Sequence, residues 1–244
     1  MILKEFKELP KEMQNDSVLK YYDILKQKKI MLLLKRFLDF IGSLILLILL
    51  SPILIILAIL IKIDSKGPVF YRQERVTTNG KIFKIFKFRT MIQDADKRGT
   101  LITGKQDSRI TRIGNKIRKC RLDELPQLIN ILKGEMSFVG TRPEVKKYVD
   151  MYTDEMKATL LMPAGVTSMA SIKFKDEDEI ISKQTKSGKT VDEAYVNDIL
   201  PEKMKWNLEY IKKFSIFEDL KICIETIGKV VKIWKNMKKK IRFL

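Results

Sequence analysis

The 244-residue sequence predicts a mainly helical α+β fold for a monotopic membrane protein, with a small β-hairpin and surface amphipathic helices. Three observations predict it. Residues 40–61 form a run of 22 residues without a charge, and residues 202–242 show helical periodicity. Between these segments, residues 69–88 combine strand-like runs with turn residues. The hydrophobic fraction of 45% excludes a disordered chain, and the length allows one ordinary core.

The composition narrows the chemistry that the chain can perform. It has no histidine, which is the commonest general base and metal ligand. Ser-His-Asp hydrolases and His-ligated zinc sites are therefore excluded, and catalysis must use carboxylates, Lys, Tyr, Ser or Cys. The two cysteines, Cys120 and Cys223, are too few for a disulfide framework and are typical of a reducing compartment.

The net charge of +18 is concentrated in two blocks. Residues 65–121 carry +12 and residues 201–244 carry +7, whereas residues 122–200 carry −4. Basic blocks of this kind bind nucleic acid, an anionic membrane surface or a polyanionic small substrate. A solvated lysine-rich face is the simplest alternative for any single run of charge.

Residues 1–30 have the pattern of an amphipathic helical lead-in, and the hydrophobic run follows it. Its 22 residues would extend about 33 Å as a helix, enough to cross a bilayer core. The run begins too far from the N-terminus for a signal peptide. One spanning helix is the default interpretation. Ser51 and Pro52 at its centre argue against it, because proline removes an amide donor and bends a helix. The neighbouring serine can satisfy a carbonyl that proline leaves unpaired.

Both flanks of the hydrophobic run are basic. The basic residues are Lys26, Lys28, Lys29, Lys35 and Arg36 before it, and Lys62, Lys66, Arg72 and Arg75 after it. The positive-inside rule places such flanks on the cytoplasmic side. A hairpin that enters the membrane and returns satisfies the rule at both ends, whereas a spanning helix leaves one basic flank outside. The flanks favour the re-entrant form, and the spanning helix stays as the alternative.

Two strands and two helices are expected before residue 135. Residues 69–71 and 83–88 predict two strands, joined through a Thr78-Asn79-Gly80 turn. Residues 111–121 predict a basic helix. Pro126 is placed to begin a helix that continues through Leu132 and ends at Gly134.

The C-terminal helix has two chemically different faces. The apolar positions near a 3.6-residue period are Cys223, Ile227, Val230, Val231, Trp234, Met237 and Ile241. The basic positions placed opposite them are Lys229, Lys232, Lys235, Lys239, Lys240 and Arg242. This pattern predicts a helix lying on a membrane surface, with a core-packed helix and a solvated tail as the alternative.

Asp123 and Glu124 form the pair that can carry chemistry. They follow the +12 block and come just before, or within, the first turn of a predicted helix, where cations and the helix dipole favour ionised carboxylates. An ionised aspartate can attack phosphorus, and two carboxylates together with phosphate oxygens suit Mg²⁺. Nearby arginines can neutralise phosphoryl oxygens. The alternative is helix capping by Asp123 with an exposed Glu124.

Eight motifs, in order over about residues 33–170, resemble the bacterial sugar transferase family, the monotopic phosphoglycosyl transferases. The motifs are KRFLD at 35–39, Ser51-Pro52, GPVFYRQERV at 67–76, FKFRTM at 86–91, DSRITRIG at 107–114, LDELPQL at 122–128, KGEMSFVGTRP at 133–143 and PAGVT at 163–167. The resemblance implies four parts: a lead-in at 1–34, a re-entrant helix at 35–63, a catalytic domain at 64–200 and basic amphipathic helices at 201–244.

The resemblance also implies an activity at the cytoplasmic face of the inner membrane. A sugar-1-phosphate passes from a UDP-sugar to polyprenyl phosphate, such as undecaprenyl phosphate, at the start of surface glycan synthesis. In the family, the residue matched by Asp123 attacks the sugar-bearing phosphate, UMP leaves, and the lipid phosphate then attacks the adduct. Glu124 is implied as its metal-binding or acid–base partner, with Mg²⁺ at the pair. Membrane lipid is a further implied partner, and a homo-oligomer is compatible with the resemblance.

The implied substrate-binding residues are Arg75, Lys87, Arg89, Arg118, Arg142 and Pro143. Arg118, five residues before Asp123, matches the phosphate-binding arginine of the family, and Arg142-Pro143 matches the end of its Pro-Arg-Pro nucleotide-binding turn. Two positions depart from the pattern. Thr141 replaces the first proline of that turn and puts its rigidity in question, and Thr77 replaces a glycine after the first strand. Lys175-Asp176-Glu177 has no role that the residues indicate.

Two other functions compete with this interpretation. A catalytically inactive, membrane-anchored scaffold of the same fold has no need of Asp123 between Arg118 and Arg142. A nucleic-acid-binding protein is suggested only by the net charge of +18. It would leave the hydrophobic run unexplained, and the sequence has no recognition-helix motif and no aromatic-rich basic sheet. We therefore expect no nucleic-acid partner.

Overall fold

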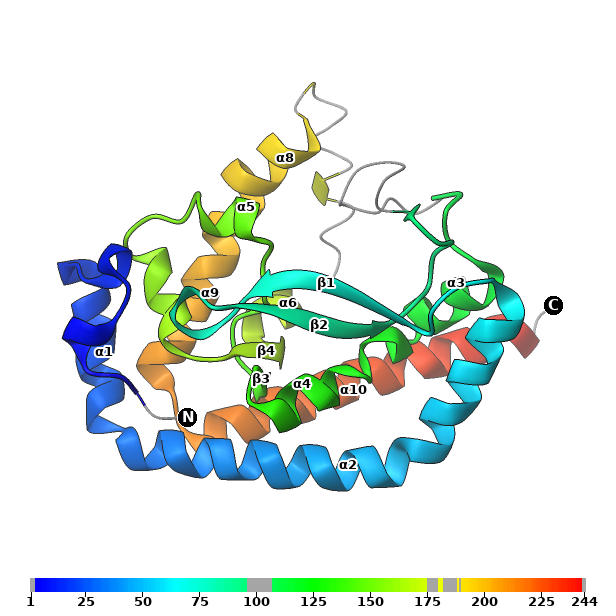
Figure 1. Ribbon diagram of the computed structural model, residues 1–244, viewed down its shortest axis with the longest axis horizontal. Helices are drawn as coiled ribbons and strands as arrows, with labels where there is room; N and C mark the ends of the chain where they lie inside the picture. The colour runs from blue at the N-terminus through cyan, green and yellow to red at the C-terminus, as the bar shows by residue number, and fades with distance from the viewer. Residues whose placement is uncertain (1–2, 96–106, 175–179, 182–187, 189, 243–244) are drawn as a thin grey trace.

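The computed structural model describes residues 3–95, 107–174, 180–181, 188 and 190–242, with backbone only over 233–242. Lys175-Asp176-Glu177 lies outside the described residues. The described part is mostly helical (Figure 1). Its helices are α1 (Asp16–Gln27), α2 (Lys29–Asp64), α3 (Arg112–Lys119), α4 (Gln127–Lys133), α5 (Lys146–Val149), α6 (Met169–Lys173), α8 (Val191–Ala194), α9 (Leu200–Lys213) and α10 (Ile216–Arg242). Its strands are β1 (Phe70–Val76), β2 (Ile82–Phe88), β3 (Met136–Val139) and β4 (Ala164–Thr167).

The hydrophobic run lies within α2, a single helix of 36 residues. Figure 1 shows α2 lying along the lower edge of the molecule and then turning upward toward α3. The predicted hairpin broken at Ser51-Pro52 is therefore a bend inside one continuous helix. The reason is local: Pro52 cannot donate to the carbonyl of Ile48, and the Ser51 hydroxyl donates to it instead, at 2.8 Å. The boundary expected after residue 34 falls inside this helix.

Charged side chains tie the first half of α2 to the body of the molecule. Arg36 donates to the carbonyls of Ile131 at 2.7 Å and Leu132 at 2.9 Å, near the end of α4. Asp39 accepts from the backbone N–H of Phe138 in β3 at 3.1 Å. The Arg36 contacts give two terminal carbonyls of α4 a charged donor, and the carbonyl of Ile131 also accepts from the N–H of the cap residue Gly134 at 2.9 Å.

The far end of α2 is tied to the same body. Asp64 accepts from the N–H of Ile113 at 2.8 Å and so caps the start of α3. Arg89, at the end of β2, donates to the carbonyls of Ser65 at 2.6 Å and Lys66 at 2.9 Å. Both ends of the apolar helix are therefore held by one globular unit.

Most of α2 is not covered by this body. Over its most apolar 18 residues, only 11% are buried, and by length and composition alone the helix could cross a membrane. Its exposed large apolar residues include Phe37, Ile45, Ile48, Leu49, Ile55, Ile56 and Ile59. A face of this size exceeds what soluble monomers normally present to water.

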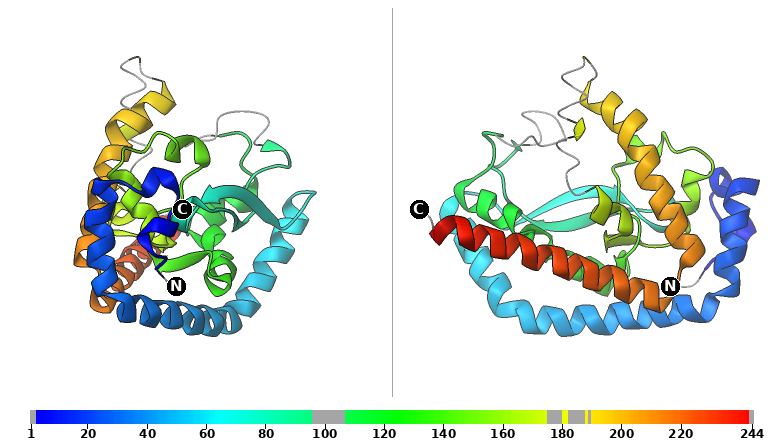
Figure 2. Two further views of the ribbon diagram at one scale, coloured as in Figure 1. Left: turned by 60° about the vertical axis from the view of Figure 1, so that its left-hand side comes forward. Right: turned by 180° about the vertical axis from the view of Figure 1, so that it is seen from behind.

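α10 adds a second apolar surface. Phe217, Leu220, Ile224 and Ile227 are each more than half exposed and follow a spacing of three and four residues, so they form one stripe along the helix. Figure 2 shows α10 crossing the back of the molecule. The predicted basic face differs at Lys229, which donates to the carbonyl of Ile172 in α6 at 2.6 Å and so turns toward the body.

A buried ion pair joins α10 to α2. Lys35 contacts Asp219 at 2.6 Å, and their side chains are 5% and 13% exposed. The Tyr210 hydroxyl donates to the other oxygen of Asp219, also at 2.6 Å. A buried pair of this kind holds its two helices in one arrangement, since separating the charges would leave an unpaired charge buried, which is energetically costly.

The predicted β-hairpin is confirmed. β1 and β2 pair antiparallel from Phe70 opposite Phe88 to Val76 opposite Ile82, and the turn has Asn79 and Gly80 at positive φ. Thr77 has an extended backbone that needs no glycine. Its hydroxyl donates to the carbonyl of Glu135 at 2.8 Å and accepts from the N–H of Ala164 at 3.1 Å. The threonine thus attaches the hairpin to the residue before β3 and to the first residue of β4.

The second sheet is absent from the sequence-based expectations. β3 and β4 pair in parallel, with Met136 opposite Ala164 and Val139 opposite Thr167. Just beyond β3, Gly140 lies against Gly165 of β4 so closely that a Cβ on Gly165 would come 2.1 Å from the Gly140 nitrogen. Only glycine allows this approach.

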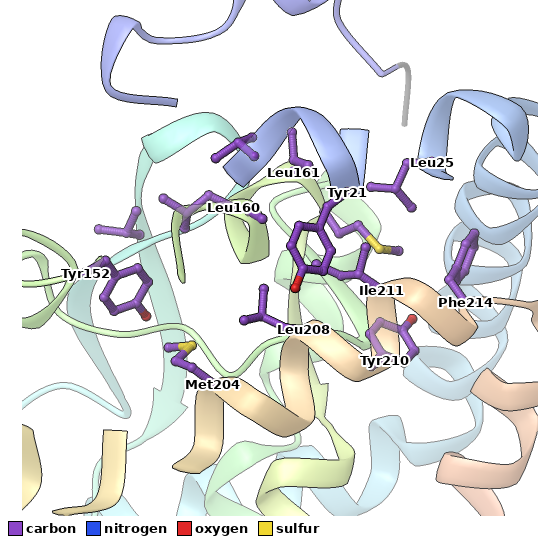
Figure 3. Packing of buried hydrophobic residues seen from close by; sticks show 14 of the residues in the cluster. Tyr21, Leu25, Tyr152, Leu160, Leu161, Met204, Leu208, Tyr210, Ile211 and Phe214 are labelled. Carbon is purple, nitrogen blue, oxygen red and sulfur yellow. The ribbon is translucent and has the colours of Figure 1, made fainter. Parts of the chain in front are cut away.

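The main core packs between α1, α9 and the turn at Met156–Leu161 (Figure 3). Tyr21, Leu25, Leu161, Ile211 and Phe214 belong to it. Two smaller clusters lie around the hairpin, one including Leu47 and Leu50 of α2 and the other Leu57 and Ile61. The hairpin is therefore packed on both halves of α2, and this fixes the position of the site described next.

Candidate active site

Asp123 and Glu124 lie in a 3₁₀ turn, Leu122–Glu124, between α3 and α4. Arg121 precedes the turn in the left-handed region, at φ 58°. A non-glycine residue rarely adopts this conformation, which reverses the chain sharply after α3. The pair is thus placed just before α4, and neither carboxylate is a helix cap.

Three cations converge on one oxygen of Glu124. Oε1 lies 2.7 Å from Nη2 of Arg142, 3.6 Å from Nζ of Lys87 and 3.7 Å from Nη1 of Arg121. Burial raises the pKa of Glu124, but Arg142, Lys87 and Arg121 outweigh it and hold the pKa well below its ordinary range. Glu124 is therefore ionised at neutral pH and organises the cations around it.

Asp123 has the opposite environment. Its Oδ1 is buried and has no hydrogen-bond partner among the described residues. Burial raises the pKa of Asp123, the charge of Glu124 raises it further, and Lys87, Arg118 and Arg121 oppose both effects. Adjacent carboxylates with pKa shifts in opposite directions suit different roles.

Lys87 completes the group. Its side chain is only 20% exposed, and burial lowers its pKa to about 8, against the opposing effect of Glu124. Repulsion from Arg142 and Arg75 contributes to this lowering of the pKa. Lys87 therefore still carries its charge near neutral pH, but loses it far more readily than an ordinary lysine.

Asp123 opens into a cavity of about 640 Å³ between the hairpin and α3. Its basic lining residues are Arg72, Arg75, Lys87, Arg89, Arg109 and Arg118. Among the described residues, its lining includes two carboxylates, Asp94 and Asp123. A cavity of this size with so many cations suits a polyanionic ligand.

The structure brings together most of the predicted site residues. Arg118 lies in the last turn of α3 and lines the same cavity as Asp123. Arg75 donates to the carbonyl of Pro143 at 3.2 Å and lies 3.9 Å from Glu144. Arg75 therefore supports the turn that carries Arg142 as well as lining the cavity.

Arg89 also lines the cavity, but its guanidinium is engaged by the carbonyls at the end of α2. This contact gives it a structural role that the sequence did not suggest. Its predicted binding of substrate anions stays a prediction.

The turn at 141–143 is held without its first proline. The carbonyl of Thr141 accepts from the N–H of Gly165 at 2.8 Å, and the N–H of Val76 donates to the carbonyl of Glu144 at 2.9 Å. Backbone bonds on both sides therefore hold Arg142 toward Glu124.

Several residues near the site were missed by sequence reasoning. Arg109 lines the cavity and contacts Asp107 at 2.6 Å, which helps hold the pKa of Asp107 at about 2. The DSRITRIG motif was a signal for it, although no role followed from the motif. Glu144 accepts from Tyr195 at 2.5 Å and lies 3.6 Å from Lys203, and no sequence signal joins these residues.

Asp123 and Glu124 are also the residues that could hold a metal ion. The described residues contain no group of three or more acidic or cysteine side chains close enough to bind one. The buried, unpartnered Oδ1 of Asp123 is nevertheless a vacant oxygen ligand. Binding through one or two carboxylates, with the remaining ligands from phosphates and water, is typical of Mg²⁺.

Comparisons with known proteins identify relatives. The family model for bacterial sugar transferases matches residues 30–233. The chain is 34% identical over 201 residues to the UDP-N-acetylgalactosamine-undecaprenyl-phosphate N-acetylgalactosaminephosphotransferase of Aeromonas hydrophila, covering 81% of this chain and 44% of that protein. It is 35% identical over 202 residues to the UDP-glucose:undecaprenyl-phosphate glucose-1-phosphate transferase of Escherichia coli (strain K12), covering 81% and 40%.

A third relative has a similar length. The chain is 32% identical over 200 residues to the uncharacterized sugar transferase EpsL of Bacillus subtilis (strain 168), covering 82% of this chain and 88% of that protein. The chain thus spans less than half of the first two relatives and most of the third.

The low pKa of Lys87 can be measured directly. In protein carrying ¹³C-labelled lysine, the Cε signal that disappears in Lys87→Arg should titrate near pH 8. Glu124→Gln removes the charge that favours the protonated lysine, so the midpoint should fall below about 8. Glu74→Gln, which removes a carboxylate paired with Lys84 on the same hairpin, should leave it unchanged. A midpoint near the ordinary lysine value of about 10.4 would contradict the buried environment.

Proposed function

Because this chain belongs to the bacterial sugar transferase family, we propose that it transfers a sugar-1-phosphate from a UDP-sugar to undecaprenyl phosphate. The names of the Aeromonas hydrophila and Escherichia coli relatives describe reactions of this type. The observation that carries the proposal is the buried, unpartnered Oδ1 of Asp123 at the wall of a cationic cavity.

The donor would place its diphosphate in the 640 Å³ cavity, where Arg75, Lys87 and Arg118 can neutralise it. Asp123 then attacks the phosphorus that bears the sugar. An aspartyl oxygen–phosphorus bond forms, the bond from that phosphorus to the bridging oxygen breaks, and UMP leaves with the bridging oxygen. A phosphosugar remains on Asp123 as an acyl phosphate.

In the second step an oxygen of the lipid phosphate attacks the same phosphorus. The new oxygen–phosphorus bond completes a lipid diphosphate sugar, and the aspartyl bond breaks to regenerate the carboxylate. Asp123 must be ionised to attack. Burial and Glu124 raise its pKa, and the nearby charges of Lys87 and Arg118 oppose this rise and so favour the reactive form. Glu124 keeps Lys87 and Arg142 in place throughout.

We also propose that Asp123 and Glu124 hold Mg²⁺. When bound, the ion would act as a Lewis acid and neutralise charge on the phosphoryl oxygens. The three cations contact Oε1 of Glu124, and Oδ1 of Asp123 has no partner among the described residues, so the pair keeps ligand capacity for the ion.

For the membrane, we propose that α2 dips into the cytoplasmic leaflet of the inner membrane and returns. Contacts from Arg36 and Asp39 hold one end, and contacts from Asp64 and Arg89 hold the other, all on one globular unit. A helix crossing the bilayer would separate its ends by about 30 Å of hydrocarbon. The bend at Pro52 and the apolar stripe on α10 support the same placement.

Replacing the nucleophile tests the reaction. Asp123→Asn should lower UMP release from a UDP-sugar by about 10³-fold or more, because an amide cannot form the acyl phosphate. The assay supplies a panel of UDP-sugars with undecaprenyl phosphate. Asp150→Asn, which alters an exposed pair with Lys146, is the control and should keep the wild-type rate. Wild-type turnover by Asp123→Asn would exclude the covalent mechanism, and an inactive wild-type protein would favour the scaffold alternative.

Removing the metal tests its proposed site. EDTA should stop UMP release, and excess Mg²⁺ should restore it, because the phosphoryl charge would lose its counter-ion. UMP release is measured with protein dialysed against EDTA, and the rate is compared with that of the same protein after Mg²⁺ is added back. Full activity after dialysis would remove the metal role of Asp123 and Glu124.

Cysteine labelling tests the membrane arrangement. In a Cys120→Ser, Cys223→Ser background, Ile30→Cys and Phe70→Cys mark the two flanks of α2, and both native side chains are exposed. An impermeant maleimide should label both positions in inverted vesicles and neither in intact spheroplasts. Labelling of one position from outside the cell would indicate a spanning helix.

A further inference from the structure

A second cavity, of about 250 Å³, lies on the other side of the turn that carries the two carboxylates. Asp123 lines the larger cavity and Glu124 lines this one, and the two cavities share no lining residue. The reaction described above uses only the larger cavity, so the smaller one has no assigned role.

The smaller cavity is mainly apolar. Its apolar lining residues are Leu125, Leu128, Phe138, Val166, Ile172 and Val230. Its cationic lining residues include Arg121 and Arg142, both of which contact Oε1 of Glu124. The positive charge is therefore beside the carboxylate pair, and the apolar surface extends away through α4, β3, β4, α6 and α10.

This cavity is continuous with the surfaces that we place in the membrane. Phe138 and Val166 pack in one cluster with Leu47 and Leu50 of α2. On α10, Thr226 and Val230 line the cavity, while their neighbour Ile227 belongs to the exposed stripe. A lipid resting against α2 and α10 would reach the cavity from the apolar side of the molecule.

We propose that the smaller cavity binds the first isoprene units of the polyprenyl acceptor, with the lipid phosphate at Arg121 and Arg142. This proposal replaces the nucleotide-binding role implied for Arg142 by the resemblance, because Arg142 lines the smaller cavity and is not among the described residues that line the larger one. The assignment rests on the proposed transferase function. A branched hydrocarbon chain matches the apolar lining, and a phosphate monoester matches the two guanidinium groups. The donor and the acceptor then approach Asp123 from separate cavities, each with its own lining.

Filling the cavity tests the assignment. Val230→Trp places a large ring in the cavity from α10, whose neighbouring turns are exposed. It should raise the KM for undecaprenyl phosphate about tenfold or more and leave the KM for the UDP-sugar unchanged. Single-turnover UMP release without acceptor should also keep its wild-type rate.

Val231→Trp is the matched control. Val231 is the adjacent residue of the same type, is 46% exposed and does not line the cavity. Tryptophan keeps this surface apolar, so both KM values should stay at their wild-type levels. An unchanged KM for undecaprenyl phosphate in Val230→Trp would overturn the assignment. A raised KM for the UDP-sugar instead would mean that the cavity holds the sugar, which also overturns it.

A second measurement uses the unaltered protein. A prenyl phosphate carrying a diazirine on its first isoprene units should crosslink to residues 121–128, 138–142, 166–172 or 224–232, which contain the cavity lining, and excess undecaprenyl phosphate should prevent the reaction. Crosslinks confined to other segments would overturn the assignment. Failure of the transferase function would look different, because the wild-type protein would then release no UMP from any UDP-sugar.

Discussion

The convergence of three cations on Oε1 of Glu124 is the interaction on which the site depends. Lys87 comes from the hairpin, Arg142 from the turn after β3, and Arg121 from the loop before the carboxylate pair. One buried carboxylate thus joins three segments that are distant in sequence. It also gives Asp123 a different environment. Because the cations contact Glu124, Asp123 keeps a buried oxygen that has no hydrogen-bond partner among the described residues. The division of roles between two adjacent acids follows from which of them the cations contact.

The apolar helix imposes a second constraint, because a chain that enters a lipid layer must keep its backbone bonded. The Ser51 hydroxyl satisfies the carbonyl that Pro52 cannot, so the bend leaves no unpaired carbonyl at Ile48. Polar contacts join both halves of the helix to the body: Arg36 donates to the carbonyl of Ile131 in α4, and Arg89 donates to the carbonyl of Ser65 just after α2. Arg89 thereby links the cavity wall to the end of the apolar helix, so this side chain couples the position of the helix to the shape of the cavity.

Features with a local cause were predictable from the sequence. The hairpin, the helix ended by Gly134, and the bend at Pro52 all follow from residues that decide their own backbone. Tertiary features were not. β3 and β4 have four residues each and find each other across a long connection, so neither shows a usable pattern. Arg121 contacts Glu124 only because its backbone is left-handed, and Lys203 reaches Glu144 from a distant helix. The carboxylate pair itself was found through its motif, whereas its opposite pKa shifts required the packed structure.

The two cavities beside the carboxylate turn have no lining residue in common. Apart from the pairing of Lys87 in one lining with Glu124 in the other, a substitution in the lining of one cavity leaves the described lining of the other intact. Evolution can alter the group accepted on the hairpin side without disturbing the surface formed by α10 and β4, and the reverse also holds. Sequences with a preserved α10 side could thus diversify on the hairpin side, since among the described residues the short turn at Leu122–Glu124 contributes to both cavities.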